Sequence, residues 1–381
     1  MLLIKGGEIH DGIHQEGYVA DILVKDGRIS KISRNLSGKG AEIMDAAGLK
    51  VYPGFVDAHS HLGLDGYGIG YEGSDYNELN DIVTPHLRGI DGFKPGQPSL
   101  KQAALAGVTT VNTGPGSANV LGGTFTAVKT VGHRAEGMIV KMETAMKCAF
   151  GENPKRVYRD KADSSRMTTA AKLREILFKT REYEAKKNAA GGDESKLPPY
   201  DMKLEAMLPV IRREMPLKAH AHAAEDIFTA LRIAREFNLL ITLEHVTEGH
   251  LIAQDLANED VPLAVGPSLT HATKFELRNK TFETPGILAR AGCQVSIITD
   301  APVIPQQYLT MCAALAVKSG MDPFLALQAI TINPARHSGI ADKVGSLEVG
   351  KDADIVLMDG DCFDMTASVT AVYILGNRVE G

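Results

Sequence analysis

Short stretches of alternating apolar and polar residues open and close the chain. Residues 20–25 and 28–32 are β-prone and flank Asp26-Gly27, which is a typical two-residue hairpin turn. Residues 353–358 form another strand pattern, and residues 371–379 repeat the hairpin pattern around a Gly-Asn pair. The sequence between these ends has a different pattern of apolar and polar residues. We therefore predict one small β-domain assembled from both ends of the chain.

The middle of the chain, from about 54 to 340, alternates short apolar runs with longer helical patterns. The strand-like runs lie at 108–111, 241–244 and 295–298, and the helical patterns with a charged face at 173–190 and 227–237. Asp322-Pro323 predicts the start of a further helix that runs to about Ile330. Asn333-Pro334 predicts a break soon after it. Strand–helix alternation over roughly 290 residues predicts an α/β fold of the (β/α)8 TIM-like barrel type.

Composition narrows the class of protein. The chain has 381 residues, of which 44% are hydrophobic and 23% are charged, and this composition is typical of a globular protein. A net charge of −6 without a dense Lys/Arg cluster argues against nucleic-acid and membrane partners.

No apolar run reaches the roughly 18 residues of a membrane span, and the apolar run of the first residues is interrupted too soon for a signal peptide. Scattered cysteines without a C-x-x-C pair suit a reducing compartment. We expect a cytoplasmic protein, and the frequency of symmetric assemblies favours a homo-oligomer.

Two histidines follow the apolar run at 51–56. His59 and His61 are separated by one residue, so in an extended strand both imidazoles point to the same side. Neutral imidazole is a common ligand of Zn²⁺ and similar metals. The pair therefore predicts a metal site at the end of this strand, with surface histidines as the alternative.

Other predicted strands also end in histidine or aspartate. The residues at these strand ends are His59 and His61, His220 and His222, His245, and Asp300. In a (β/α)8 barrel the carboxyl ends of the strands meet at one face, where active sites lie. Imidazole and carboxylate ligands with a position left for water suit a divalent cation. Asp300 could be both ligand and general base, taking a proton from water and passing it to a leaving nitrogen.

Three segments resemble the amidohydrolase superfamily. PGFVDAHSHLG is similar to its first-strand signature, GVTTV to a segment after its first helix, and VGSLEVGKDADIVLMD to its C-terminal motif. The resemblance covers essentially the whole chain and is nearest to imidazolonepropionase-like proteins and related amide or dipeptide hydrolases. It implies a β-sandwich built from residues 1–52 and 341–381, and a metal-dependent hydrolase barrel over 53–340.

The resemblance also implies a set of metal ligands. It places His59, His61 and Asp300 on a first metal, with one histidine from the fifth strand and His245 from the sixth. On the fifth strand we favour His220 as the ligand and His222 as a neighbour that contacts the substrate.

A lysine or glutamate on the fourth strand bridges two metals in some branches of the superfamily. The candidates are Lys141, Glu143 and Lys147, and we favour Lys147 in carboxylated form. The alternative is a lysine that binds a substrate carboxylate beside a single metal. The resemblance implies a divalent metal as the cofactor, with Zn²⁺ favoured, as one ion or two.

Three further residues are predicted to contact the substrate at the mouth of the barrel. Arg156 belongs to a charged loop that could hold a carboxylate bidentately, or could be a solvated surface. His271 and Lys274 follow the predicted seventh strand, where substrate contacts are expected.

The expected function is hydrolysis of a C–N bond in a small molecule. The substrate class is a cyclic or linear amide, dipeptide-like or imidazolone-like. Asp300 acts as the general base, and His245 holds the second metal or the substrate oxygen. One alternative is a deaminase of an amino-heterocycle, and another is a barrel without catalytic activity that serves a structural role. The filled ligand positions argue against the structural role.

Overall fold

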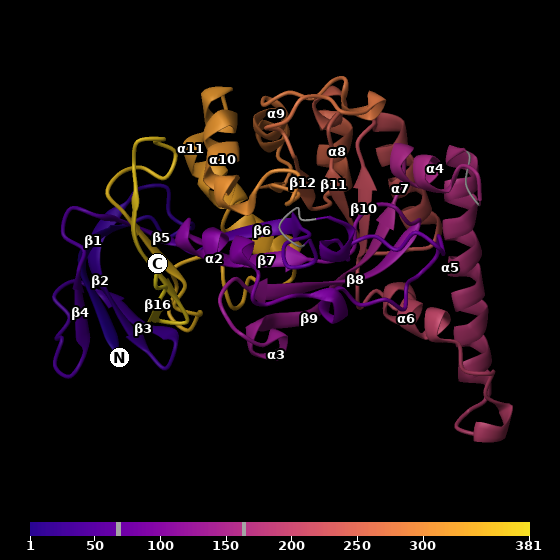
Figure 1. Cartoon of the computed structure of the whole chain (residues 1–381), viewed down its shortest axis with the longest axis horizontal. Coiled ribbons are helices and arrows are strands. Elements are labelled where there is room, and N and C mark those ends of the chain that lie inside the picture. The colour runs from indigo at the N-terminus through magenta and orange to yellow at the C-terminus, as the bar shows by residue number, and fades with distance from the viewer. Residues whose placement is uncertain (66–69, 162–164) are drawn as a thin grey trace.

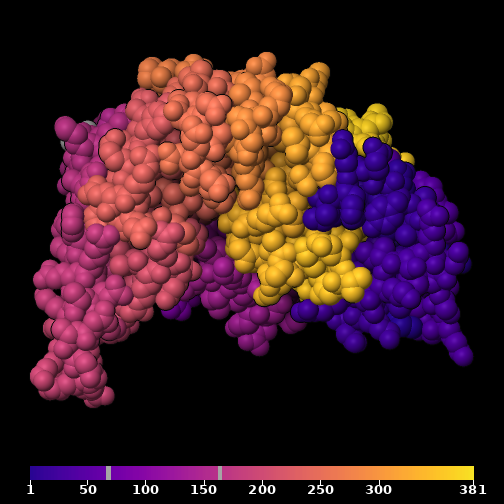
Figure 2. All heavy atoms as spheres, turned by 180° about the vertical axis from the view of Figure 1, so that it is seen from behind, coloured from indigo at the N-terminus to yellow at the C-terminus, as the bar shows by residue number. Residues whose placement is uncertain are grey.

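The computed structural model describes residues 1–65, 70–161 and 165–381, which form two β-sheets side by side (Figure 1). The first, here called the terminal sheet, has the order β16-β15-β14-β5-β1-β2-β3, with β4 paired to β1. Its strands are β1 Leu2–Ile9, β2 Tyr18–Lys25, β3 Arg28–Ser33, β4 Glu42–Asp45, β5 Lys50–Pro53, β14 Ile355–Met358, β15 Val369–Ile374 and β16 Asn377–Arg378. Figure 2 shows the last residues of the chain packed against the first ones. The predicted domain assembled from both ends is therefore confirmed.

The two predicted hairpins are present in the terminal sheet. β2 pairs with β3 and β15 with β16, both antiparallel. Asp26 and Gly27 have φ values of 49° and 76°, and two positive φ angles are what a tight type I′ hairpin turn requires. Strand β5 lies between β1 and β14 and ends at Pro53, so the chain passes from the terminal sheet into the barrel within one residue.

The second sheet is a nearly closed barrel with the strands in sequence order. Its strands are β6 Phe55–Ser60, β7 Val108–Thr113, β8 Leu121–Lys129, β9 Ile139–Ala149, β10 Leu217–Ala221, β11 Ile241–His245, β12 Leu263–Val265 and β13 Val295–Ile297. The edges at β6 and β13 are bridged by the Asp57 carboxylate, which accepts hydrogen bonds from the backbone N–H of Thr299 at 3.0 Å and its hydroxyl at 2.7 Å. The predicted (β/α)8-type barrel is confirmed.

One strand of the barrel departs from the regular strand–helix repeat. Strand β8 pairs antiparallel with both β7 and β9. Residues 114–120, all of them described, connect β7 to β8 without a helix and begin with Gly114-Pro115-Gly116. A tight connection of this kind reverses the chain, whereas a parallel neighbour needs a crossover of a dozen or more residues.

Helices cover the outside of the barrel and fill its connections. They are α1 Gly89–Gly92, α2 Pro98–Leu105, α3 Ala135–Met138, α4 Glu152–Tyr158, α5 Arg166–Ala189, α6 Met202–Ile211, α7 Ala224–Glu236, α8 Ala253–Glu259, α9 Thr284–Arg290, α10 Leu309–Lys318, α11 Pro323–Ala329 and α12 Ile332–His337. The helical patterns at 173–190 and 227–237 correspond to α5 and α7. Over the described ranges, no helix is both long enough and apolar enough to cross a bilayer.

The helix predicted from Asp322-Pro323 to about Ile330 is present as α11, but the break predicted at Asn333-Pro334 needs a correction. Asp322 caps α11 as expected, since its carboxylate accepts a hydrogen bond from Leu325 N–H at 3.0 Å. The chain then breaks at Ile330-Thr331, and Asn333-Pro334 lies inside α12 instead of marking the break. Proline is tolerated there because the first turn of a helix leaves its N–H groups without intrahelical partners.

Candidate active site

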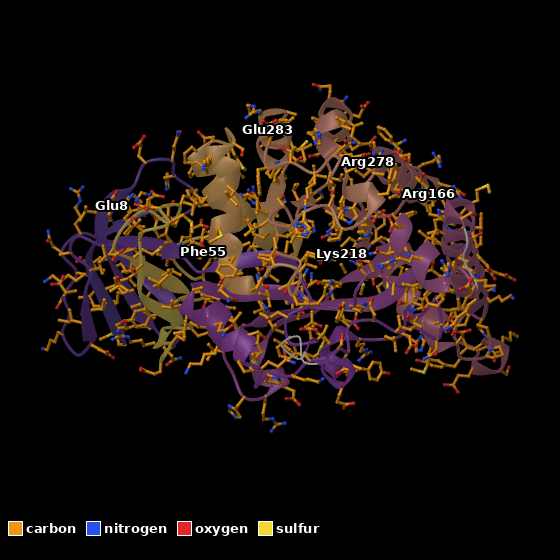
Figure 3. The ribbon with its side chains drawn as sticks, turned by 45° about the horizontal axis from the view of Figure 1, so that its top comes forward. Glu8, Phe55, Arg166, Lys218, Arg278 and Glu283 are labelled. Carbon is orange, nitrogen blue, oxygen red and sulfur yellow. The ribbon has the colours of Figure 1, made fainter. Side chains whose placement is uncertain are left out.

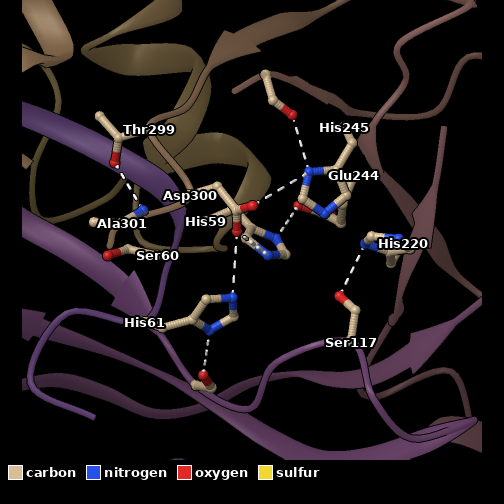
Figure 4. Close-up of polar contacts among 12 residues, drawn as sticks. His59, Ser60, His61, Ser117, His220, Glu244, His245, Thr299, Asp300 and Ala301 are labelled. Carbon is tan, nitrogen blue, oxygen red and sulfur yellow. Dashed lines mark hydrogen bonds and ion pairs between the residues drawn. The ribbon is translucent and has the colours of Figure 1, made fainter. Parts of the chain in front are cut away.

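The carboxyl ends of four barrel strands meet at one buried cluster (Figure 4). Asp300, which follows β13, is at its centre. Its Oδ1 atom lies 3.2 Å from Nε2 of His61 and 3.6 Å from Nε2 of His59, both from β6 and the residues after it. Its Oδ2 atom lies 3.9 Å from Nδ1 of His245 at the end of β11. His220 lies in β10 and His222 directly follows it, and both rings contact the ring of His245.

Each imidazole of the cluster is fixed through Nδ1. The Nδ1 partners are Glu244 Oε2 for His59 at 2.8 Å, Gly114 O for His61 at 2.7 Å, Gly266 O for His245 at 2.9 Å, Ser117 Oγ for His220 at 2.8 Å and Thr247 Oγ1 for His222 at 2.7 Å. A partner on one ring nitrogen sets the orientation of the ring and leaves the other nitrogen for a metal. The Nε2 atoms of the five rings are therefore available as ligands.

Two of the site residues have left-handed backbone conformations. His245 has φ of 74° and Asp300 has φ of 54°, although neither is glycine. Along β11, alternation would send Glu244 and His245 to opposite faces of the sheet. The left-handed turn at His245 instead brings its imidazole into the cluster beside the buried Glu244. Strained backbone of this kind is concentrated at functional sites.

Burial sets the protonation of the cluster. It lowers the pKa of His59, His220 and His222 well below the ordinary value, and that of His245 to about 4. These rings are therefore neutral at pH 7, as metal ligands must be. Burial alone would raise the pKa of Asp300, but the neighbouring histidines, His245 and His61 foremost, hold it below the ordinary value. The carboxylate is ionised.

Two groups of side chains could each hold a metal ion. One consists of His59, His245 and Asp300, and the other of His220, His222 and His245, with the ligand atoms of each group within 4.8 Å of one another. Nε2 of His245, which belongs to both groups, is buried and has no hydrogen-bond partner among the described residues. Buried polar atoms normally have partners, so this orphan fits a site built for a metal ion.

Lys147 on β9 is fully buried beside this cluster. Its Nζ atom lies 3.2 Å from Nε2 of His59, and burial lowers its pKa to about 8. The two alternatives on the same strand lie elsewhere. Glu143 forms an ion pair with Arg88 at 3.4 Å, and the Lys141 Nζ atom lies against Gly339.

A cavity of about 520 Å³ opens onto the cluster. Of the residues predicted to contact the substrate, Arg156, His222 and Lys274 line it. His271 is exposed and is not among the residues that line it; its carbonyl oxygen accepts a hydrogen bond from Lys280. The structure thus leaves His271 outside the cavity. Lining residues that the sequence did not single out include Tyr76, Asn77 and Val303.

Beneath the cluster lies a buried polar group that sequence reasoning also missed, here called the Lys218 network. It consists of Lys218, Glu244 and His337, and Figure 3 labels Lys218 within the barrel. Glu244 Oε2 lies 2.8 Å from Lys218 Nζ, and Oε1 lies 2.8 Å from His337 Nε2. Lys218 precedes His220 by two residues, so strand alternation could have pointed to it. His337 comes from α12, and no local pattern indicates it.

Comparisons with known proteins agree with this architecture. A solved structure of an amidohydrolase from Thermotoga maritima superposes with a TM-score of 0.96 and 42% identity, covering 100% of both chains. Imidazolonepropionase from Thermoplasma acidophilum is 26% identical over 90% of this chain and 83% of its own length. Amidohydrolase tasK from Hapsidospora irregularis is 28% identical over 96% of this chain, which spans only 40% of that relative.

The family-level match is broad. The model of the Amidohydrolase family matches residues 51–379, which include the whole barrel sheet and strands β14–β16. Relatives that align along most of this chain carry hydrolase names, and the structural likeness extends from end to end. The chain therefore belongs to the amidohydrolase family.

Proposed function

We propose that the enzyme hydrolyses the C–N bond of a small cyclic or linear amide, imidazolone-like or dipeptide-like, with a divalent metal held by His59, His61 and Asp300. The observation that carries this proposal is the approach of both Nε2 atoms to one carboxylate oxygen, at 3.6 and 3.2 Å. Neutral imidazoles around a carboxylate suit Zn²⁺, which we favour, although similar sites accept other divalent metals.

Lys147 and His245 complete the proposed ligand set. A lysine becomes a metal ligand when its neutral amine adds CO2 and loses a proton, which leaves an anionic carbamate. A pKa of about 8 keeps a useful fraction of the Lys147 amine neutral near pH 7. Its Nζ faces His59 Nε2, and Lys147 is not among the residues that line the cavity. This position suits a metal ligand better than a group that binds a substrate carboxylate.

Asp300 is the proposed general base. A divalent metal bound here would make water acidic enough to act as a nucleophile at neutral pH and would polarise the substrate carbonyl. Asp300 is ionised, and its side chain is 14% exposed while His59 beside it is fully buried, so it can accept a proton from a water in the cavity. It then gives that proton to the leaving nitrogen, and the C–N bond breaks.

The cavity favours a small substrate that carries an anionic group. Its volume of about 520 Å³ suits a small molecule and not a polypeptide chain. The cationic side chains of Arg156 and Lys274 line it, and Asn153 adds an amide. A carboxylate held by these groups would place the amide carbon near Asp300.

The test is a substrate screen with metal-depleted and metal-reconstituted enzyme. Dipeptides, N-acyl amino acids and cyclic amides are offered to both forms, and amine or acid release is measured. We expect activity on at least one of these classes that disappears after chelation and returns with Zn²⁺, Mn²⁺ or Co²⁺. Activity that survives complete metal removal would overturn the proposal.

A further inference from the structure

The cavity that opens onto the cluster offers cationic groups and amide donors to a ligand. Arg156 and Lys274 are its cationic lining residues, and among the described residues that line it Asp300 is the only carboxylate. We propose that this cavity selects substrates that carry a carboxylate and no ammonium group. N-acylated amino acids and cyclic amides with a carboxylate are then preferred to free dipeptides. This substrate choice rests on the proposed function, which supplies the reaction.

Two asparagines that line the cavity use their amide oxygens inside the protein. Asn77 Oδ1 accepts a hydrogen bond from the Ala118 backbone N–H at 3.2 Å, and Asn153 Oδ1 accepts one from Lys274 Nζ at 2.9 Å. An amide with its oxygen engaged in this way has its NH2 group left for other partners. Nδ2 of Asn153 lies 3.4 Å from Nε2 of His220, which is long for a hydrogen bond. Both amides can therefore donate to acceptor oxygens of a ligand.

Lys274 is held in place by two acceptors. Its Nζ atom lies 2.7 Å from Glu276 Oε1 and 2.9 Å from Asn153 Oδ1. An ammonium has three N–H donors, so one is left after these two contacts. The side chain of Lys274 is 16% exposed and lines the cavity, where the third donor can meet a ligand oxygen. Lys274 thus offers a donor that two protein contacts keep in position.

Glu276 is a carboxylate that the cavity does not expose to a ligand. It belongs to a short 3-10 helix, η4 Phe275–Leu277, its side chain is 1% exposed, and it is not among the lining residues. Its Oε2 atom accepts a hydrogen bond from the Glu152 backbone N–H at 2.9 Å. Gly151 leaves space for that oxygen, because a Cβ atom on Gly151 would lie 2.5 Å from it. With Oε1 paired to Lys274, the charge of Glu276 is already neutralised inside the protein.

An ammonium group in this cavity would meet like charges and no free carboxylate. Arg156 and Lys274 repel it, and the proposed reaction already engages Asp300 with the metal and the attacking water. Moving a charge out of water without a partner is costly. A free dipeptide carries its ammonium next to the scissile amide, whereas an N-acyl amino acid carries only the carboxylate. The cavity therefore discriminates by repulsion as well as by attraction.

The test compares matched ligands that differ in the ammonium group. Isobutyryl-alanine and alanyl-alanine have nearly the same shape, since a methyl group in the first replaces the ammonium of the second. Their ketomethylene analogues, in which CH2 replaces the scissile N–H, bind without being cleaved. Dissociation constants are measured by calorimetry on the full chain as purified, at pH 7. The wild type should bind the isobutyryl analogue at least about tenfold more tightly than the alanyl analogue and than its own carboxamide.

Lys274→Met and Glu276→Gln should change this preference in opposite directions. Lys274→Met removes a cation and leaves the Glu276 carboxylate without its partner, so the alanyl analogue should gain at least about tenfold relative to the isobutyryl analogue. Glu276→Gln leaves the ammonium without a counter-ion, so the isobutyryl analogue should bind about three- to tenfold more tightly. Lys274→Gln serves if the first variant does not fold, as circular dichroism checks. The exposed Glu283→Gln and Lys318→Met are controls and should bind as the wild type does.

Binding of these analogues is measured apart from turnover, which separates the substrate choice from the proposed function. Equal affinity of the wild type for the two analogues, tighter binding of the alanyl analogue, or no binding of either overturns the inference. A Lys274→Met variant that keeps the wild-type preference, or a Glu276→Gln variant that does not bind the isobutyryl analogue more tightly, also overturns it, because a purely structural ion pair predicts that result. Metal-independent hydrolysis overturns the proposed function, whereas the preference measured by binding stands or falls by itself.

Discussion

Glu244 Oε2 lies 2.8 Å from Nδ1 of His59, and both side chains are completely buried. The same oxygen lies 2.8 Å from the Lys218 ammonium. One carboxylate thus fixes the ring of a proposed metal ligand and neutralises a buried lysine. The Lys218 network therefore connects metal affinity with the stability of the barrel.

Glu244→Gln should lower both metal affinity and stability. The glutamine keeps the shape but leaves the Lys218 ammonium buried without a counter-ion, a loss of about 3–5 kcal/mol for a buried pair. Metal affinity should fall about 10–100-fold because His59 loses its anionic partner. Urea unfolding and metal titration measure the two effects, with the exposed Glu283→Gln as control. Unchanged metal affinity would show that Glu244 does not orient His59.

Asp300→Asn should abolish turnover while the fold is kept. The amide is nearly isosteric, but it cannot accept the proton from the attacking water, and general-base catalysis contributes about 10²–10⁴-fold. The measurements are kcat/KM on a substrate from the screen, thermal unfolding and metal content. Activity like that of the wild type would contradict the assignment of the general base.

Lys147→Ala should reduce the metal content of protein purified without chelator. If a carboxylated Lys147 is a ligand, a wild-type content of two equivalents should fall to one or none. The exposed Lys318→Ala is the control and should leave the content unchanged. One equivalent in both wild type and Lys147→Ala would instead indicate a single-metal site with an unmodified lysine.

The metal-free enzyme should lose stability in mild acid. His245 has a pKa of about 4 in the folded chain against an ordinary value of 6.5, so the unfolded chain binds the proton first. The free energy of unfolding is therefore unaffected by this ring above pH 6.5 and decreases as the pH falls toward 4, by about 3 kcal/mol in all. The free energy of unfolding, measured with urea between pH 7 and 4.5, should fall less steeply with decreasing pH for His245→Gln than for the wild type. The exposed His133→Gln should match the wild type. Equal slopes for all three would contradict a depressed pKa.

Strand alternation and strand-end positions were enough to predict the barrel and the residues of the cluster. Alternation failed where the backbone leaves the regular strand: at His245 only its left-handed conformation places both it and Glu244 inside. The reversed strand β8 was also missed, because no strand was predicted over residues 121–129 and the short connection that reverses the chain before it was therefore not recognised. The expected domain boundaries, the cytoplasmic location and the homo-oligomer stay predictions.

Residues brought together only by the loops could not be predicted. Glu276 comes from the residues after β12, and its Oε1 atom lies 3.8 Å from Nε2 of both His220 and His222. Gly151, from between β9 and α4, leaves space for its other oxygen. No spacing in the sequence predicts a contact of this kind. His271 was predicted to contact the substrate, but it is exposed and does not line the cavity. Lys274, three residues further along the chain, does line it.

The position of β5 between β1 and β14 has a consequence for synthesis on the ribosome. β5 ends at Pro53, whereas its neighbour β14 begins at Ile355, after the entire barrel has been translated. Until then one edge of β5 stays unpaired, and open strand edges invite pairing with other chains. Contacts between segments so distant in sequence also form slowly. Nascent chains should therefore be most prone to aggregation late in translation, and a cut just before β14 should leave a chain that cannot complete its first sheet.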